Sequence, residues 1–364
     1  MIRKGLFALA CILFLLFGHV TAVFSADHVE FTDRHSFEND TVEQLIEVWA
    51  LDDDYDYDEA QAMIDRIGKI PERMIKNTVD NDVKLLFIDF PLVELDEYSH
   101  LVGEVPRGWE GRGYTWDDVP GAGGRTTVAR IGYSAQGELH NSINLEYHEY
   151  GHAIDNYTFN EPLSTTEEFR DLHIAEQQSL FGDDPYFDYA EEYFAEALAY
   201  YFSGGNYKEQ LKEKAPETYR FFDTLEESVL TVENSDEHGI ELSWESVDDA
   251  VTYEVFRDRE KIEETESLSF TDAEFHEHTN HLYGVQALDE SGEVIHQTFE
   301  VSVLTEEKAV VEEVEEISED VADERAKQGE AEDTTNFNLS IYVILGFIAG
   351  ALTVLFIILR KKKK

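Results

Sequence analysis

The sequence predicts an α+β domain, then an all-β sandwich, and then a transmembrane helix near the C-terminus. In the first part, two short apolar runs with strand character are followed by three segments of helical periodicity, which is typical of an α+β domain. From about Leu230 onward, apolar residues alternate with polar ones, as in half-buried strands. The uncharged run Leu339–Leu359 reaches about 31 Å at roughly 1.5 Å per residue, which matches a hydrocarbon core of about 30 Å.

The two ends of the chain predict export and membrane anchoring. Residues 1–26 have basic side chains, then an apolar run, then small residues, so we interpret them as a secretory signal peptide or, alternatively, an uncleaved anchor. The basic residues 360–364 directly follow the second apolar run, which places this tail in the cytoplasm by the positive-inside rule. Gly346 and Gly350 in that run would permit a weak homodimer. Without a Leu-Pro-x-Thr-Gly wall signal, we expect a single-pass membrane protein of a Gram-positive bacterium, with its ectodomain outside the cell.

The strongly acidic composition excludes some partners. The chain has 79 acidic and 28 basic residues and a formal net charge of −51, and such a surface repels nucleic acid and anionic lipid. Attraction of cationic substrates is one interpretation, but the acidic residues extend through the whole ectodomain, which favours solubility in a salty or alkaline habitat. The one cysteine, Cys11, lies in the signal peptide, so no disulfide or thiol chemistry is expected in the mature protein.

The first domain, residues 27–228, is predicted element by element. Apolar residues recur at helical spacing between Asp27 and Asp82, which predicts two or three amphipathic helices. Ser164 and Glu167 form a capping box at the start of a later helix. The remaining predicted elements are strands at 83–90 and 126–133, a glycine-rich segment at 103–124, and helices at 141–157, 165–178 and 189–202.

A second domain, residues 229–305, is predicted to be a β-sandwich. Trp244 on an early strand and Tyr283 on a late one make it resemble the immunoglobulin-like fibronectin type III module, which commonly serves as a spacer or adhesive unit. The histidine-rich segment 276–281 lacks a four-residue spacing and is interpreted as a solvated loop. Residues 306–338 are predicted to be a solvated acidic stalk before the membrane helix at 339–359 and the tail at 360–364. The expected strands are 240–244, 252–256, 282–288 and 294–303.

The motif His148-Glu149-Tyr150-Gly151-His152 predicts a zinc site. Two histidines four residues apart on a helix lie on one face, so both imidazoles can bind one ion. Glu149 is rotated by about 100° from His148, which directs it toward a water on the metal rather than to the metal itself. Zinc lowers the pKa of that water toward about 7, and the carboxylate would take its proton and later give it to a leaving amine. A chance match is the alternative.

A catalytic zinc needs a third protein ligand and an open position. Glu192 and Glu196 are four residues apart in the helix predicted at 189–202, where they interrupt an aromatic, alanine-rich sequence that suits burial. Because buried carboxylates need partners, we expect Glu192 to bind one zinc ion per chain and Glu196 to hold a ligand histidine by its other nitrogen. Glu191 is the competing ligand, and a solvated acidic face is the alternative interpretation.

Hydrolysis also benefits from a donor to the developing oxyanion. Tyr186 and Tyr189 stand just before the helix that carries Glu192, and either phenol could supply this hydrogen bond. The sequence leaves the choice between them open, and packing is the alternative role for each.

Three segments resemble the catalytic domain of anthrax lethal factor and its peptidase relatives. They are residues 105–124, which include Trp-Asp-Asp-Val-Pro-Gly, the H-E-x-x-H motif at 148–152, and Glu-Tyr-Phe-Ala-Glu-Ala at 192–197. The resemblance covers roughly residues 80–225 and implies a zincin-like fold, with a small mixed sheet over the active-site helix. It also implies zinc binding by both histidines and Glu192, a base role for Glu149, and a catalytic tyrosine nearest to Tyr186.

Together these observations predict a membrane-anchored, extracellular zinc metalloendopeptidase acting on protein or peptide substrates. Few residues precede the first predicted strand, so a counterpart of the translocation-partner domain of lethal factor, and action in a host cytosol, are not expected. Related secreted enzymes cut near prolines in surface proteins, which is an analogy for specificity. The alternatives are a surface adhesin or binding protein with the zincin domain as its scaffold, and a protease that processes the producer's own exported proteins.

Overall fold

A computed structural model of the protein describes residues 30–305, except residues 33, 108, 138 and 237. The predicted signal peptide, acidic stalk, membrane helix and basic tail lie outside these residues. Within the described part, no helix combines the length and the apolar character that crossing a membrane requires.

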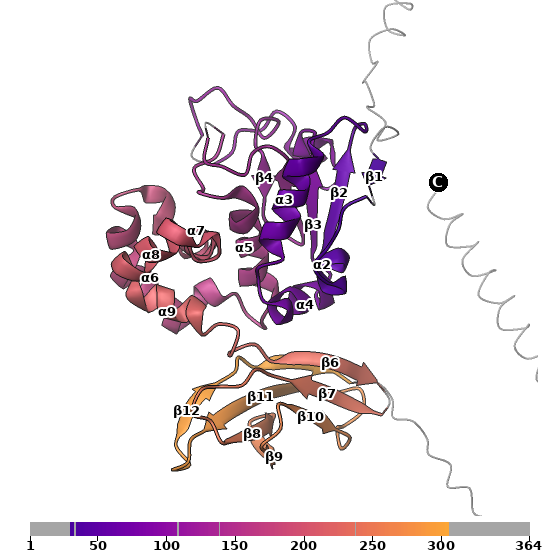
Figure 1. The fold of residues 1–364 in the computed structure, drawn as a ribbon, viewed down its shortest axis with the longest axis vertical. Helices are drawn as coiled ribbons and strands as arrows, with labels where there is room; N and C mark the ends of the chain where they lie inside the picture. The colour runs from indigo at the N-terminus through magenta and orange to yellow at the C-terminus, as the bar shows by residue number, and fades with distance from the viewer. Residues whose placement is uncertain (1–29, 33, 108, 138, 237, 306–364) are drawn as a thin grey trace, which may run out of the picture. The chain divides into compact units, whose positions relative to one another are not determined.

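A five-stranded mixed sheet organises the first domain (Figure 1). Its three inner strands run parallel, and the strand at each edge is antiparallel to its neighbour. The short strand β4 therefore forms one edge. In spatial order, the strands are β1 (Glu30–Thr32), β2 (Ile46–Ala50), β3 (Lys84–Ile88), β5 (Thr126–Arg130) and β4 (Gly121–Ala122).

The two or three helices predicted before residue 82 are present as three, but the strand β2, which lies between the first two of them, was not predicted. The helix α2 ends at Leu45, and the next five residues form a strand in which alternate side chains are buried. Ile46 and Trp49 fit helical spacing in the sequence, but they pair with Leu85 and Ile88 of β3, and this tertiary contact decides the conformation. The helices are α2 (Asp40–Leu45), α3 (Tyr57–Ile67) and α4 (Glu72–Asp80).

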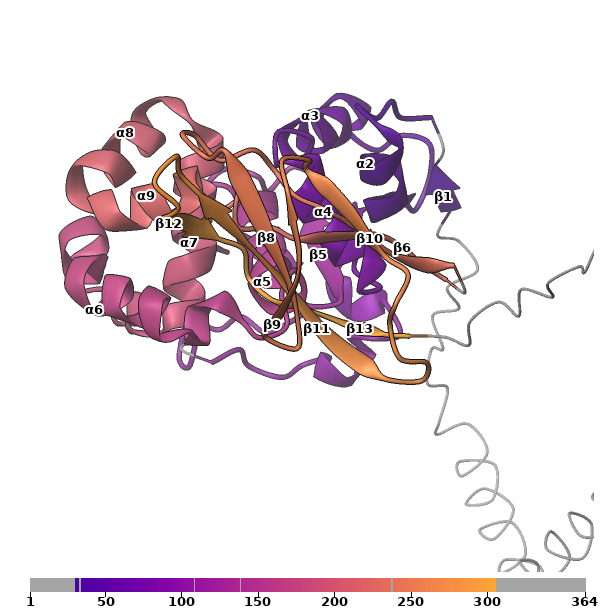
Figure 2. The ribbon, with the colours of Figure 1, turned by 90° about the horizontal axis from the view of Figure 1, so that it is seen from below.

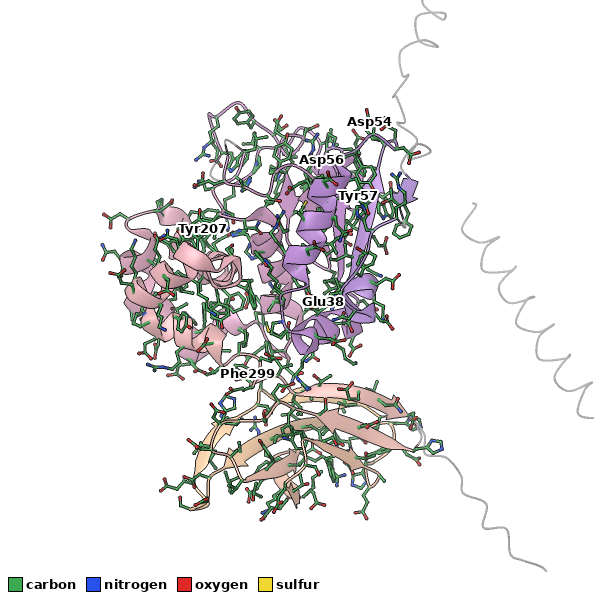
Figure 3. All side chains as sticks on the ribbon, in the orientation of Figure 1. Glu38, Asp54, Asp56, Tyr57, Tyr207 and Phe299 are labelled. Carbon is green, nitrogen blue, oxygen red and sulfur yellow. The ribbon has the colours of Figure 1, made fainter. Side chains whose placement is uncertain are left out.

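The start of α3 illustrates how local chemistry sets a helix boundary. The Asp56 side chain accepts a hydrogen bond from the Glu59 backbone N–H at 3.1 Å, which satisfies one of the free donors of the first turn. Tyr57, the first residue of the helix, stacks on the His35 ring with centroids 4.4 Å apart. Figure 3 labels Asp56 and Tyr57 at this end of the helix.

Five helices complete the first domain, and three of them lie where the sequence predicts helices. Figures 1 and 2 show α5 between the sheet and the group formed by the later helices. The last two were not predicted, and a one-turn 3-10 helix, η4, precedes α7. The elements are α5 (Leu145–Tyr157), α6 (Glu167–Phe181), η4 (Pro185–Asp188), α7 (Ala190–Ser203), α8 (Gly205–Lys214) and α9 (Pro216–Asp223).

The capping box predicted from Ser164 is not formed. Thr166 caps α6 by accepting a hydrogen bond from the Phe169 N–H at 3.3 Å. Ser164 instead donates from its N–H and its hydroxyl to the buried Asp155 of α5, at 2.7 and 2.6 Å. The serine therefore ties the loop after α5 back to that helix.

The helices α5 and α7 touch through their backbones. A Cβ atom added to Gly151 of α5 would lie 3.0 Å from the Cα and 3.3 Å from the carbonyl oxygen of Ala195 in α7. Interiors are packed at the density of organic crystals, so this crossing has no room for a larger residue. Gly151 and Ala195 therefore set the spacing between the two helices that carry the predicted ligands.

The second domain consists of two antiparallel sheets around a separate core. One sheet has the order β10-β7-β6, and the other has the order β12-β11-β8-β9 with β13 also paired to β11. The core of the first domain extends to Val229, and that of the second begins at Leu230 and contains Trp244 and Tyr283. The strands are β6 (Thr231–Asp236), β7 (Gly239–Ser243), β8 (Thr252–Arg257), β9 (Glu260–Thr265), β10 (Ser269–Asp272), β11 (Asn280–Leu288), β12 (Val294–Gln297) and β13 (Val301–Leu304).

Side chains of the first domain bond to the strands of the second. Arg73 of α4 donates to the Thr231 and Ser243 hydroxyls at 3.1 and 2.8 Å and pairs with Glu245. Phe159, which follows α5, packs edge-on against Phe299, labelled in Figure 3, with centroids 4.7 Å apart. These polar and aromatic contacts join the first domain to residues 231–245 and to Phe299 of the second.

Candidate metal centre

The two histidines of the H-E-x-x-H motif and Glu192 lie together. His148 and His152 project from the same face of α5, one turn apart, and Glu192 comes from the first turn of α7. The Nε2 atom of each histidine is 3.3 Å from Oε2 of Glu192. One ligand atom from each residue falls within 4.8 Å of the others, and this is the one such group of three among the residues that the structure describes. Glu191, the competing ligand, is not part of it.

Glu196 contacts the imidazole of His148 at Nδ1, the nitrogen opposite the one that faces Glu192. Its Oε2 atom is 3.0 Å from Nδ1 of the imidazole, and its Oε1 atom accepts the Ile143 N–H at 3.0 Å. The carboxylate is nearly fully buried, with 2% of its surface exposed. A proton on Nδ1 that is donated to Glu196 leaves Nε2 free to bind an ion, which is the arrangement usual for metal-binding histidines.

The donor set fits a divalent cation such as zinc. Oε2 of Glu192 is buried without a hydrogen-bond partner, although it faces two imidazole nitrogens. Burial alone would raise the pKa of Glu192, but the neighbouring imidazoles of His148 and His152 hold it far below its usual range. Two imidazoles and one carboxylate are a common ligand set for catalytic zinc, and an ion would partner the orphaned oxygen.

Glu149 lies beside this group, on the side of the sheet edge. A Cβ on Gly121 of β4 would lie 2.8 Å from Cγ of Glu149, so the edge strand passes directly over this carboxylate. Burial raises the pKa of the Glu149 carboxyl, and the neighbouring His148 and His152 oppose that rise. A carboxylate with a raised pKa is a better proton acceptor near neutral pH than an ordinary glutamate.

Glycines of the sheet edge allow β4 to approach α5. A Cβ on Gly123 would lie 2.5 Å from Cβ of His152 and 3.0 Å from the backbone oxygen of Glu149. Real Cβ atoms do not approach other atoms so closely, and the obstacles include backbone, so a side chain here would displace the ligand-bearing helix. The glycine-rich composition of residues 103–124 thus has a steric reason at this position.

We therefore expect Gly123→Ala to lower kcat by about tenfold or more and to cost roughly 1–3 kcal/mol of stability, because overpacking forces the helix to move. Thermal unfolding and peptide cleavage measure both effects. Gly124→Ala is the matched control, since a Cβ there meets nothing nearer than the Tyr98 hydroxyl at 3.6 Å. Equal behaviour of the two variants would contradict the steric explanation.

The structure distinguishes the two tyrosines left open by the sequence. The ring of Tyr186 stacks over His148, with centroids 6.4 Å apart and an interplanar angle of 24°. Burial, and then the Glu192 carboxylate, raise the pKa of the Tyr186 phenol far above its ordinary value, so it remains a proton donor. Tyr189 instead lies under the Arg107 guanidinium, 4.3 Å from ring centroid to Cζ. Tyr186 is therefore the tyrosine next to the metal-binding side chains.

Sequence reasoning missed Arg107. Its guanidinium reaches from the glycine-rich segment to within 3.8 Å of Oε1 of Glu192, although most of the side chain is exposed. The stems of this segment are held by Asp117, whose carboxylate accepts the Gly103 N–H at 2.7 Å and the Thr115 hydroxyl at 2.8 Å. No spacing rule marks Arg107, because its contact with α7 is made across the fold.

The histidine-rich segment of the second domain has a structural role at its last residue. His281 on β11 is buried, and its Nδ1 atom lies 2.6 Å from Asp258. Its Nε2 atom accepts the His276 N–H at 3.1 Å. Both ring nitrogens are thus used within the domain, whereas His276 and His278 are exposed, as the interpretation of a loop requires.

An H-E-x-x-H helix, a glutamate from a second helix, and a short sheet edge over the motif define a metallopeptidase of the zincin type. Comparison with known proteins assigns the family. Residues 33–225 match the family model described as Anthrax toxin lethal factor, N- and C-terminal domain. The chain belongs to this family of zinc metallopeptidases and is an endopeptidase.

Two curated relatives are Pro-Pro endopeptidases. The protein of Clostridioides difficile is 41% identical over 171 residues, which cover 47% of this chain and 77% of the relative. The protein of Paenibacillus alvei is 41% identical over 173 residues, which cover 47% of this chain and 79% of the relative. The solved structure of the Paenibacillus alvei enzyme is 38% identical, covers 51% of this chain and 99% of its own, and gives a TM-score of 0.48.

Proposed function

We propose that this protein is a membrane-anchored zinc endopeptidase of the outer cell surface that uses Glu149 as its general base. The observation that carries the proposal is the convergence of His148, His152 and Glu192 within 4.8 Å, directly beside the Glu149 carboxylate. His148, His152 and Glu192 would hold one zinc ion, and Glu196 would orient His148 through Nδ1.

The side chains of the site divide the work of hydrolysis. Zinc bound there would supply Lewis acidity, which polarises a scissile carbonyl and makes water more acidic. The Glu149 carboxylate accepts a proton from the attacking water and delivers it to the leaving amine. The Tyr186 hydroxyl donates a hydrogen bond to the oxygen that becomes negatively charged. The edge strand β4 offers backbone groups to an extended peptide.

We also propose that the peptide bond cleaved lies next to proline. Both curated relatives are named Pro-Pro endopeptidases and are 41% identical to this chain over 171 and 173 aligned residues. Two exposed aromatic side chains lie before α7, Tyr186 over His148 and Tyr189 under the Arg107 guanidinium. Aromatic-lined grooves suit proline-rich segments, because the proline ring packs against them and the backbone is already extended.

Anchoring rests on the sequence. The apolar run 339–359 and the basic residues 360–364 support a single membrane span with the catalytic domain outside the cell. The two antiparallel sheets of residues 229–305, with Trp244 and Tyr283 in their shared core, support a fibronectin type III-like module between the peptidase and the stalk. Such a module would raise the active site above the membrane.

Cleavage of a peptide library by residues 27–305 tests the function. We expect cleavage enriched at bonds flanked by proline, lost on treatment with a chelator and restored by zinc. The same domain carrying Glu149→Gln serves as the control for contaminating peptidases. Zinc-dependent cleavage without a proline preference would reject the proposed specificity, and absence of any cleavage by metal-loaded protein would reject the enzyme.

A further inference from the structure

The turn that carries Tyr186 depends on its neighbours for its position. Tyr186 belongs to the one-turn 3-10 helix η4, and its N–H donates to the Asp184 carboxylate at 3.0 Å. Short 3-10 turns have poor hydrogen-bond geometry and little stability of their own. Tyr186 is also 41% exposed, so the stacking of its ring over His148 covers only part of the side chain. Contacts made by the rest of η4 therefore contribute to its position.

Three of those contacts come from α6. Nε2 of His173 lies 2.8 Å from the carbonyl oxygen of Phe187, the residue after Tyr186. The Phe187 ring is buried and stacks on Phe181, with centroids 3.9 Å apart and an interplanar angle of 21°. An exposed third contact joins Gln177 to Asp188 at 3.3 Å. Of these, the His173 bond alone acts on the main chain adjacent to Tyr186.

His173 also connects the turn to the ligand-bearing helix. Its ring lies against Tyr193 of α7, with centroids 5.1 Å apart, and Tyr193 directly follows Glu192. The Nε2–H group must be the donor, because a backbone carbonyl only accepts. His173 thus bridges α6, η4 and α7, and its described contacts go to Phe187 and Tyr193 rather than to the three metal-binding side chains.

We propose that His173 is a positioning residue that holds the Tyr186 hydroxyl at the catalytic site by anchoring the Phe187 carbonyl. The inference rests on the proposed function, in which Tyr186 stabilises the transition state. A donor of that kind must be placed to within a fraction of an ångström, and a displacement of about 1 Å can reduce the rate by about 100-fold.

A double-mutant cycle tests this role. His173→Phe should lower kcat about tenfold with little change in KM or in zinc content, because the loss falls on the transition state. In a Tyr186→Phe background the same substitution should have no further effect on kcat, since the group that it displaces is already absent. His173→Gln keeps an N–H donor and should restore most of the activity. Gln177→Ala, which removes the exposed contact, should behave as wild type.

A readout without substrate separates this inference from the proposed function. Hydrogen exchange of the amides of residues 186–189 should quicken in His173→Phe and remain slow in His173→Gln. Unchanged exchange in His173→Phe would overturn the inference even in a protein without peptidase activity. An equal loss of kcat in both Tyr186 backgrounds would also overturn it, while leaving a chelator-sensitive wild-type enzyme, and hence the proposed function, intact.

Discussion

Glu149→Gln is expected to abolish peptide cleavage while the metal site stays filled. Glutamine has nearly the same shape as glutamate but cannot take a proton from water, so the loss should fall on kcat, by roughly 10²–10⁴-fold. Glu149 lies beside the metal-binding side chains without belonging to their group of three, so the ion should remain bound. Steady-state kinetics on a cleaved peptide, together with zinc analysis of the dialysed protein, measure the two quantities separately.

The exposed Glu94, replaced in the same way, is the matched control for removal of one negative charge from this acidic protein. It should retain full activity. If Glu149→Gln kept wild-type kcat, another group would have to be the base. If Glu149→Gln lost zinc together with activity, Glu149 would be a metal ligand, and its assignment as the base would be wrong.

Glu192→Ala is expected to remove the metal. The substitution deletes the carboxylate whose Oε2 atom faces both imidazoles at 3.3 Å, which leaves two ligands of three. Loss of an orienting partner behind a ligand typically costs 10–100-fold in metal affinity, and loss of a ligand should cost more than this. Zinc retained against a competing chelator measures the affinity, and peptide cleavage should fall with it.

Substitutions of two neighbouring carboxylates serve as comparisons for the loss of metal affinity. Glu191→Ala changes the same charge one position earlier on α7 but lies outside the metal-binding group, so zinc should be retained. Glu196→Ala removes the partner of His148 Nδ1 and should fall between the two, with an affinity loss of about 10–100-fold. Loss of zinc in Glu191→Ala with retention in Glu192→Ala would transfer the ligand role.

Local periodicity was sufficient to predict much of the site. The four-residue spacings of His148 with His152 and of Glu192 with Glu196 follow from the geometry of single helices, and the structure has both helices. The sequence favoured Glu192 but left Glu191 as a competing ligand, because that choice depends on how α7 rotates against α5. In the structure, the close contact between Gly151 and Ala195 fixes which face of α7 is turned toward α5.

Contacts between distant segments account for what was missed. The strand β2 was not predicted, because its conformation is decided by pairing with β3, almost forty residues later in the chain. Arg107 had no signal, because its distance from Glu192 depends on the course of the glycine-rich segment. The helices α8 and α9 pack on α6 and α7, but neither carries a residue of the site, so the chemistry offered no guide to them.

The active site has a rigid part, where α5 and α7 are in backbone contact at Gly151 and Ala195, and a less constrained part in the glycine-rich segment. Helices that touch main chain to main chain cannot slide or tilt without a clash, so the ligand cage is as rigid as the fold itself. The less constrained part is built on residues 103–118, where Gly103, Gly111 and Gly113 adopt positive φ angles of 72°, 83° and 85° and the stems are closed by one carboxylate. A shift of that segment would then leave the positions of the three metal-binding side chains unchanged.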